Sequence, residues 1–142
     1  MPQIKDVMTK DVKLINPTDS LQQAAQLMRE QGCGILPVQE DDQLVGMITD
    51  RDIVIRCIAE GGGSDAEVGD FMSEEVKYCY ETDELAAICQ NMAENQLRRL
   101  PVMNDQKRLV GIVSLSDLSK QEPQGAGQAL SEITKPNGQN YT

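Results

Sequence analysis

The feature that most constrains this chain is an internal repeat with a period of 64 residues. When the sequence is shifted by 64 positions, its first half aligns with its second, and one extra residue near Lys107 then raises the offset to 65. Self-similarity at a fixed period indicates two copies of one structural unit. The matching residues are Asp6, Met8, Val12, Thr18, Asp19, Leu21, Met28, Leu36-Pro37-Val38, Leu44-Val45-Gly46 and Asp52 in the first copy, and Asp70, Met72, Val76, Thr82, Asp83, Leu85, Met92, Leu100-Pro101-Val102, Leu109-Val110-Gly111 and Asp117 in the second.

Both copies predict the order strand, helix, strand, strand, helix, because their apolar residues recur with the same periodicity. In the first copy we expect strands Val12–Ile15, Ile35–Val38 and Leu44–Thr49, with a turn at Asp41-Asp42. A helix capped by Asp19 or Ser20 is expected to bury Leu21, Ala24, Ala25 and Met28 and to end at Gly32. A second helix is expected from about Asp50. In the second copy we expect strands Val76–Tyr80, Leu100–Met103 and Leu109–Ser114, a helix over Asp83–Asn95 and a helix from about Ser116.

This pattern predicts a mixed α+β fold of two β-α-β-β-α repeats. One copy is too short to be comfortably stable alone, so we expect the copies to pack about a pseudo-twofold axis with two equivalent clefts. The expected organisation is a first repeat at residues 4–60, a Gly-rich linker at 61–67, a second repeat at 68–119 and a polar tail at 120–142. In the tail, Ala126–Ile133 is predicted to form a short helix and the rest to be disordered.

Composition narrows the chemistry. The chain contains no His, which excludes Ser-His-Asp catalysis and His-ligated zinc or haem. Its four cysteines lack the C-x-x-C spacing of redox and zinc sites and are typical of free thiols in a reducing cytosol. We therefore expect a cytoplasmic protein with no catalytic residues and no metal site. A net charge of −10 argues against nucleic acid as a partner, and no apolar stretch is long enough for a signal or membrane segment.

The most specific local signal is the motif Gly46-Met47-Ile48-Thr49-Asp50-Arg51-Asp52, which recurs as Gly111-Ile112-Val113-Ser114-Leu115-Ser116-Asp117. In both, a strand ends in a hydroxyl residue, a helix begins, and an aspartate follows three positions later. A helix N-terminus favours an anion, the hydroxyl can donate to a phosphate oxygen, and the carboxylate can accept from ribose hydroxyls. The same residues are also ordinary helix caps, and this structural interpretation stays open.

These motifs resemble those of tandem cystathionine-β-synthase (CBS) domain proteins of the stand-alone bacterial and archaeal type, also called Bateman modules. The Leu-Pro-Val strands and the Asp-Val-Met or Asp-Phe-Met start of each repeat carry the same resemblance, which covers about Ile4 to Leu118. It implies a non-enzymatic regulatory sensor that binds AMP, ADP or ATP, with S-adenosylmethionine or NADH as second choices and no required cofactor. It also implies a homodimer and an effector protein that reads the ligand state.

In tandem CBS domain proteins, each cleft also takes residues from the opposite repeat. Carried over to this sequence, the resemblance assigns Thr49, Arg51, Asp52, Tyr78, Cys79, Arg98 and Arg99 to the first cleft. It assigns Lys13, Leu14, Gly34, Ile35, Ser114 and Asp117 to the second. Because two guanidinium groups suit phosphate, we expect the first cleft to tolerate more phosphate charge than the second. The alternative function is a pure dimerisation or protein-interaction module with vestigial clefts.

Overall fold

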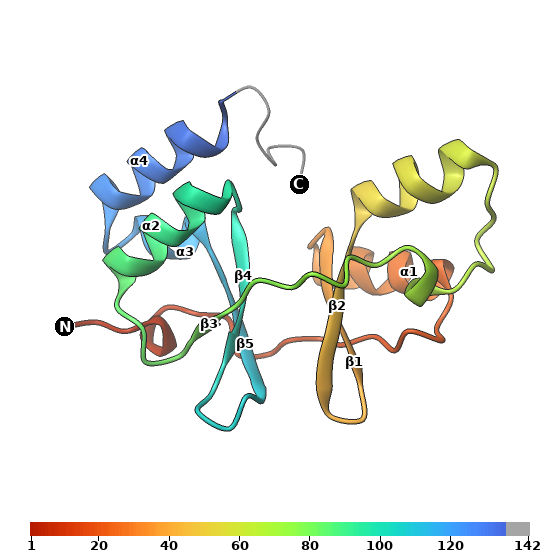
Figure 1. Ribbon diagram of the computed structural model, residues 1–142, viewed down its shortest axis with the longest axis horizontal. Coiled ribbons are helices and arrows are strands. Elements are labelled where there is room, and N and C mark those ends of the chain that lie inside the picture. The colour runs from red at the N-terminus through yellow and green to blue at the C-terminus, as the bar shows by residue number, and fades with distance from the viewer. Residues whose placement is uncertain (136–142) are drawn as a thin grey trace. The chain divides into compact units, whose positions relative to one another are not determined.

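The computed structural model describes residues 1–135 and divides the chain into two compact units (Figure 1). Unit 1 contains Met1–Val12 together with the described residues from Lys77 onward, and unit 2 contains Lys13–Val76. The chain therefore passes from one unit to the other twice, after Val12 and after Val76. Consequently, each unit combines residues from both sequence repeats.

Unit 2 is built on helix α1 (Leu21–Gln31) and the antiparallel hairpin of β1 (Ile35–Glu40) and β2 (Gln43–Thr49). A helical segment follows β2, with a π-helix at Asp52–Cys57 and a 3-10 turn at Ile58–Glu60, and a second 3-10 turn lies at Val68–Asp70. The core is aliphatic, as the near absence of aromatic residues requires. It consists of Ile15, Leu21, Ala24, Met28, Leu36, Val38, Ile48, Cys57 and Val68.

The predicted limits of α1 are confirmed by its caps. The Ser20 hydroxyl accepts a hydrogen bond from the Gln23 N–H at 3.1 Å, and the Gln23 side chain accepts from the Ser20 N–H at 2.8 Å. Gly32 ends the helix in the left-handed conformation with φ of 63°, which only glycine adopts without cost. The inward face is narrower than expected, because Ala25 is exposed while Leu21, Ala24 and Met28 are buried.

One prediction for unit 2 needs correction. Val12–Ile15 does not form a strand: only Ile15 pairs, through a single parallel bridge to Val38, because the chain enters unit 2 only at Lys13. The Gly-rich segment 61–67, predicted to link the two repeats, belongs to unit 2. There its carbonyl groups satisfy the first N–H groups of α1, with Leu21 donating to Ala66 at 2.8 Å and Gln22 to Ser64 at 3.0 Å.

Unit 1 contains a three-stranded sheet in the order β3-β4-β5, with β3 (Cys79–Tyr80) parallel to β4 (Arg99–Met103) and β4 antiparallel to β5 (Leu109–Ser114). Helices α2 (Leu85–Asn95), α3 (Leu115–Ser119) and α4 (Pro123–Ile133) complete it. The predicted strand Val76–Tyr80 is shortened to two residues, whereas the other expected strands and helices are found within a few residues. The mixed α+β class with two repeats is confirmed.

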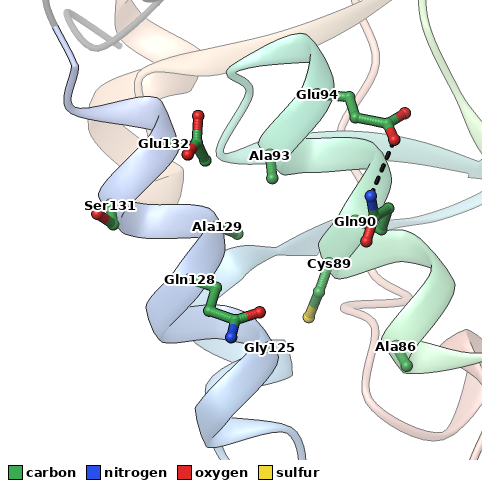
Figure 2. A pocket seen from close by; sticks show the side chains of 10 residues that line it. All are labelled: Ala86, Cys89, Gln90, Ala93, Glu94, Gly125, Gln128, Ala129, Ser131 and Glu132. Atoms are coloured by element: carbon green, nitrogen blue, oxygen red, sulfur yellow. Dashed lines mark hydrogen bonds between the residues drawn. The ribbon is translucent and has the colours of Figure 1, made fainter.

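Helix α4 is part of the core of unit 1 and not a trailing tail. It begins at Pro123, three residues before the predicted start, and its Ala126, Ala129 and Ile133 are buried. Figure 2 shows α4 beside α2, where small residues allow a close approach: a Cβ built on Gly125 would lie 3.3 Å from the Cys89 sulfur. The expectation of disorder is therefore wrong for 123–125, while residues 136–142 lie outside the described residues.

The Asp-x-Met motif at the start of each repeat (Asp6–Met8 and Asp70–Met72) packs in the unit that is formed mainly by the other repeat. In unit 1, Ile4 is fully buried, and a Cβ on Gly111 would lie 2.7 Å from both the Met8 sulfur and the Thr9 carbonyl oxygen. Thr9 and Ile112 exchange backbone hydrogen bonds at 2.9 and 3.0 Å. Unit 2 repeats the arrangement: Met72 and Ser73 lie over Gly46, and Ser73 pairs with Met47. The two glycines are therefore required by close packing.

Gly111→Ala is expected to destabilise the protein by about 1–3 kcal/mol, because the new methyl group meets a backbone carbonyl that cannot move without breaking the Thr9 pairing. Urea unfolding followed by circular dichroism measures this. The matched control is Gly127→Ala in α4, where nothing lies within 4 Å of the added atom. The control should stabilise by up to about 1 kcal/mol through helix propensity, and equal effects of both variants would contradict the packing argument.

Ile133→Ala is expected to cost about 2–5 kcal/mol, since Ile133 is fully buried at the end of α4. Leu130→Ala, on the exposed side of the same helix, should change the free energy of unfolding by less than about 0.5 kcal/mol. Both values come from the same denaturation measurement. A small cost at Ile133 would mean that α4 does not contribute to the core.

Candidate functional site

The two predicted motifs form the same local structure at the start of the helix that follows a strand. In unit 2, the Thr49 N–H donates to Oδ2 of Asp52 at 2.9 Å, and the Asp52 N–H donates to the Thr49 hydroxyl oxygen at 3.0 Å. In unit 1, the Ser114 N–H donates to Oδ2 of Asp117 at 2.9 Å, and the Asp117 N–H donates to the Ser114 hydroxyl oxygen at 3.0 Å. Each motif is therefore a reciprocal capping box.

The capping box leaves part of each carboxylate available. Only Oδ2 of Asp117 is used by the cap, and Oδ1 has no hydrogen bond within residues 1–135. In unit 2, Oδ1 of Asp52 lies 3.7 Å from the Arg56 guanidinium. The sequence analysis missed this ion pair, although residues four positions apart on a helix are neighbours. Each hydroxyl also keeps its O–H proton, since it only accepts in the cap. A bound molecule could receive hydrogen bonds from the hydroxyl and donate to the carboxylate.

The first strand of each hairpin places a further predicted residue beside the cap. Ile35 is the cross-strand partner of Thr49, and Arg99 is the partner of Ser114. Residues directly opposite on antiparallel strands share one face of the sheet, so Arg99 and Ser114 are neighbours on one face of unit 1.

The residue before each of these strands hydrogen-bonds the start of the helix. The Gly34 carbonyl accepts from the Asp50 N–H, and the Arg98 carbonyl accepts from the Leu115 N–H, both at 2.8 Å. A Cβ on Gly34 would meet the Asp50 carboxylate, so a larger residue at this position would require the Asp50 side chain to move. The sequence analysis did not find this contact.

Arg98 carries an unusual buried donor. Its Nε is inaccessible to solvent and has no hydrogen-bond partner among the described residues. An unsatisfied buried donor costs about 1–3 kcal/mol, so such an atom needs a physical explanation. An anionic group of a bound molecule beside the arginine would provide the missing acceptor.

Tyr78 and Cys79 lie at the edge of the unit 1 sheet and differ in accessibility. Tyr78 is 39% exposed, and its ring meets that of Tyr80 edge-on with centroids 5.7 Å apart. Cys79 is buried, with its sulfur 3.8 Å from the Pro101 carbonyl oxygen. Burial, with a smaller contribution from the Asp83 charge, raises the pKa of the Cys79 thiol to about 12. Since the thiolate is the nucleophile, Cys79 is inert near neutral pH and acts as an apolar side chain.

The structure groups the predicted site residues by unit. Thr49, Arg51, Asp52, Lys13, Leu14, Gly34 and Ile35 belong to unit 2, while Ser114, Asp117, Tyr78, Cys79, Arg98 and Arg99 belong to unit 1. Each predicted cleft takes residues from both units, and the assembly of the clefts stays a prediction.

Three further properties of the described residues bear on ligand, metal and membrane binding. A groove of about 590 Å³ lies between α2 and α4, and none of the predicted site residues lines it (Figure 2). Within residues 1–135, no group of three or more Cys, Asp or Glu side chains is arranged to hold a metal ion. No helix in this part of the chain is both long and apolar enough to cross a membrane.

Several proteins of similar length have similar sequences. The chain is 40% identical to CBS domain-containing protein YhcV of Bacillus subtilis over 139 residues, which is 96% of this chain and 99% of the relative. It is 37% identical to Hypoxic response protein 1 of Mycobacterium tuberculosis over 128 residues, which is 89% of each chain. The alignments span nearly whole proteins.

Solved structures with a similar fold also include CBS domain proteins. Hypoxic Response Protein I, with two coordinated zinc ions, matches with a TM-score of 0.74 and 37% identity over 84% of this chain and 98% of that one. The CBS domain pair of MJ0100 in complex with 5'-methylthioadenosine and S-adenosylmethionine matches with a TM-score of 0.75 and 25% identity over 84% and 94% of the two chains. CBSX2 in complex with AMP matches with a TM-score of 0.74 and 25% identity over 87% and 98%.

The family assignment rests on both repeats. A model of the CBS domain family matches residues 4–58 and 68–122, which overlap the two repeats predicted from the sequence. Relatives of this kind include CBS pairs solved with adenosine-type ligands. The chain belongs to the CBS domain family and contains two CBS domains.

Proposed function

We propose that this protein is a regulatory module, not an enzyme, which binds an adenosine-containing ligand at its Thr49–Asp52 and Ser114–Asp117 motifs. The observation that carries the proposal is the pair of capping boxes, in which the cap uses one carboxylate oxygen and leaves acceptor capacity for ribose hydroxyl groups. The hydroxyl groups of Thr49 and Ser114 supply donors for a phosphate oxygen. Relatives solved with AMP or S-adenosylmethionine support this choice of ligand class.

A second candidate is a protein-interaction or dimerisation module whose motifs are only helix caps. The specific observation in its favour is the exposure of Val54, Ile55 and Ile58, large apolar side chains of unit 2 that a protein partner could cover. The two candidates differ in their response to nucleotides, because a pure interaction module gains no stability from them. The homodimer predicted from the sequence is compatible with both.

The ligand proposal is tested with Asp52→Asn and Asp117→Asn, alone and together. An Asn side chain can still accept from the Thr49 or Ser114 N–H, so the cap survives, but the negative charge and part of the acceptor capacity for ribose are lost. In a thermal-shift titration with AMP, ADP, ATP, NADH and S-adenosylmethionine, a ligand at 100 times its Kd should stabilise the wild type by about 2.7 kcal/mol per site, several degrees in Tm.

We expect the double variant to keep the apo Tm within a degree or two and to lose the shift, while GTP gives none with either protein. Thr49→Ser is a matched control, since it retains the hydroxyl. Absence of any wild-type shift at millimolar adenosine ligands would favour the interaction module. A shift that persists in the double variant would place the ligand elsewhere.

The two motifs should also differ in phosphate preference. Arg98 and Arg99 correspond to Gly34 and Ile35 in the first repeat, so only the second repeat has guanidinium groups at these positions. The Nε of Arg98 also has no hydrogen-bond acceptor among the described residues. Arg98→Gln/Arg99→Gln is expected to weaken ATP binding at least tenfold and adenosine binding less than twofold in calorimetric titrations. Combining the double Arg variant with Asp52→Asn or with Asp117→Asn shows which motif binds the same ATP molecule as the arginines. The sequence analysis predicts that this is the motif of Asp52. Equal losses of affinity for ATP and for adenosine would contradict a phosphate-binding role of the arginines.

A further inference from the structure

One side chain of unit 2 joins the Thr49–Asp52 motif to a distant part of the chain. The Arg56 guanidinium donates through Nη1 to the Phe71 carbonyl oxygen at 2.6 Å, and the same nitrogen lies 3.7 Å from Oδ1 of Asp52. Oδ1 is the carboxylate oxygen that the capping box leaves available. Arg56 therefore lies between the proposed ribose acceptor and a carbonyl group in a segment that is remote in sequence.

That carbonyl group belongs to residues 68–73, which we name the anchor segment. At its end, Ser73 exchanges backbone hydrogen bonds with Met47 of β2 at 2.8 and 3.0 Å. The chain leaves unit 2 a few residues later, after Val76. Because Phe71 is only two positions before Ser73, an interaction that holds the Phe71 carbonyl also favours the pairing of the anchor segment with β2.

The second repeat has no such connection among the described residues. Gln121 stands at the position that corresponds to Arg56. Gln121 is exposed and uncharged, and its side chain has no hydrogen bond within residues 1–135. The capping box of Asp117 and the pairing of Thr9 with Ile112 form nevertheless. The same local structure therefore forms without an arginine, and the fold does not require one at this position.

The attraction between Asp52 and Arg56 depends on how much water surrounds it. The two side chains are 17% and 49% exposed, so solvent screens the ion pair and it contributes little in the free protein. A ligand whose ribose hydroxyls bind Asp52 removes water from the carboxylate, and opposite charges attract more strongly where water is excluded. A bound ligand would therefore hold Arg56 more firmly in the position from which it donates to the Phe71 carbonyl.

We propose that Arg56 is a positioning residue that couples ligand binding at the Thr49–Asp52 motif to the packing of the anchor segment. The inference rests on the proposed ribose-binding role of Asp52. A ligand at the Ser114–Asp117 motif is not transmitted in this way, because Gln121 replaces the arginine. The first motif therefore reports its ligand to the chain that leaves unit 2. By linkage, the packed anchor segment raises the ligand affinity of this motif by the same factor.

The test measures amide hydrogen exchange of Ser73 and Met47 in the Asp117→Asn protein, in which the proposed function leaves only the first motif able to bind. AMP is the probe, and each protein is compared without AMP and at the same multiple of its own Kd from calorimetry. Arg56→Gln and Arg56→Lys are added to this background. Arg29→Gln is the matched control, since it removes an exposed positive charge from α1 of the same unit.

We expect AMP to slow exchange at Ser73 and Met47 by about fivefold or more in the Asp117→Asn protein and in the Arg29→Gln control. With Arg56→Gln the slowing should fall below about twofold, because a neutral amide is not attracted to Asp52. Arg56→Lys keeps the charge and should restore part of the effect. Circular dichroism checks that all variants are folded.

A purely structural role of Arg56 would change exchange without AMP and leave the effect of AMP the same. Equal slowing by AMP with and without Arg56 therefore overturns the coupling, while ligand binding itself stands. A failure of AMP to bind the Asp117→Asn protein in calorimetry overturns the proposed function at this motif and the coupling with it.

Discussion

The close contact of a methionine and a backbone carbonyl with a glycine is the constraint on which both units depend. Met8 and Thr9 lie over Gly111, and Met72 and Ser73 over Gly46, so that a residue with a side chain fits at neither glycine without a shift. Through these contacts the start of each sequence repeat belongs to the unit formed mainly by the other repeat. The exchange explains why the chain crosses between the units twice and why each unit contains residues of both repeats.

The capping boxes connect local folding to the proposed function. Asp52 and Asp117 satisfy the first N–H group of their motif, which sets where each helix begins, and the same carboxylates are the proposed ribose acceptors. A side chain held by a cap is pre-organised, so little conformational entropy is lost when a ligand binds. The structural and functional interpretations of these residues are therefore compatible, and Asp-to-Asn substitutions separate them because the amide oxygen can keep the cap.

The two units have diverged in ways that their common architecture does not require. Unit 2 has most of the net charge and an exposed apolar helix face, whereas unit 1 is nearly neutral and gains α4, which packs on α2. The arginine pair before β4 replaces a glycine and an isoleucine before β1. Among these differences, α4 adds the buried side chains of Ala126, Ala129 and Ile133 to the core of unit 1, so it contributes to stability.

The repeat, the hairpins and the helix caps follow from the sequence, because each depends on neighbours within a few positions. Ser20, Gly32 and the Thr49–Asp52 motif are local signals, and the structure has each in its predicted element. Contacts between distant segments were decided only by the tertiary structure. No local pattern shows that residues 1–12 pack with the second repeat, that segment 61–67 accepts hydrogen bonds from the start of α1, or that the polar tail forms α4 in the core of unit 1. These outcomes depend on which apolar surfaces remain to be buried after the local elements have formed.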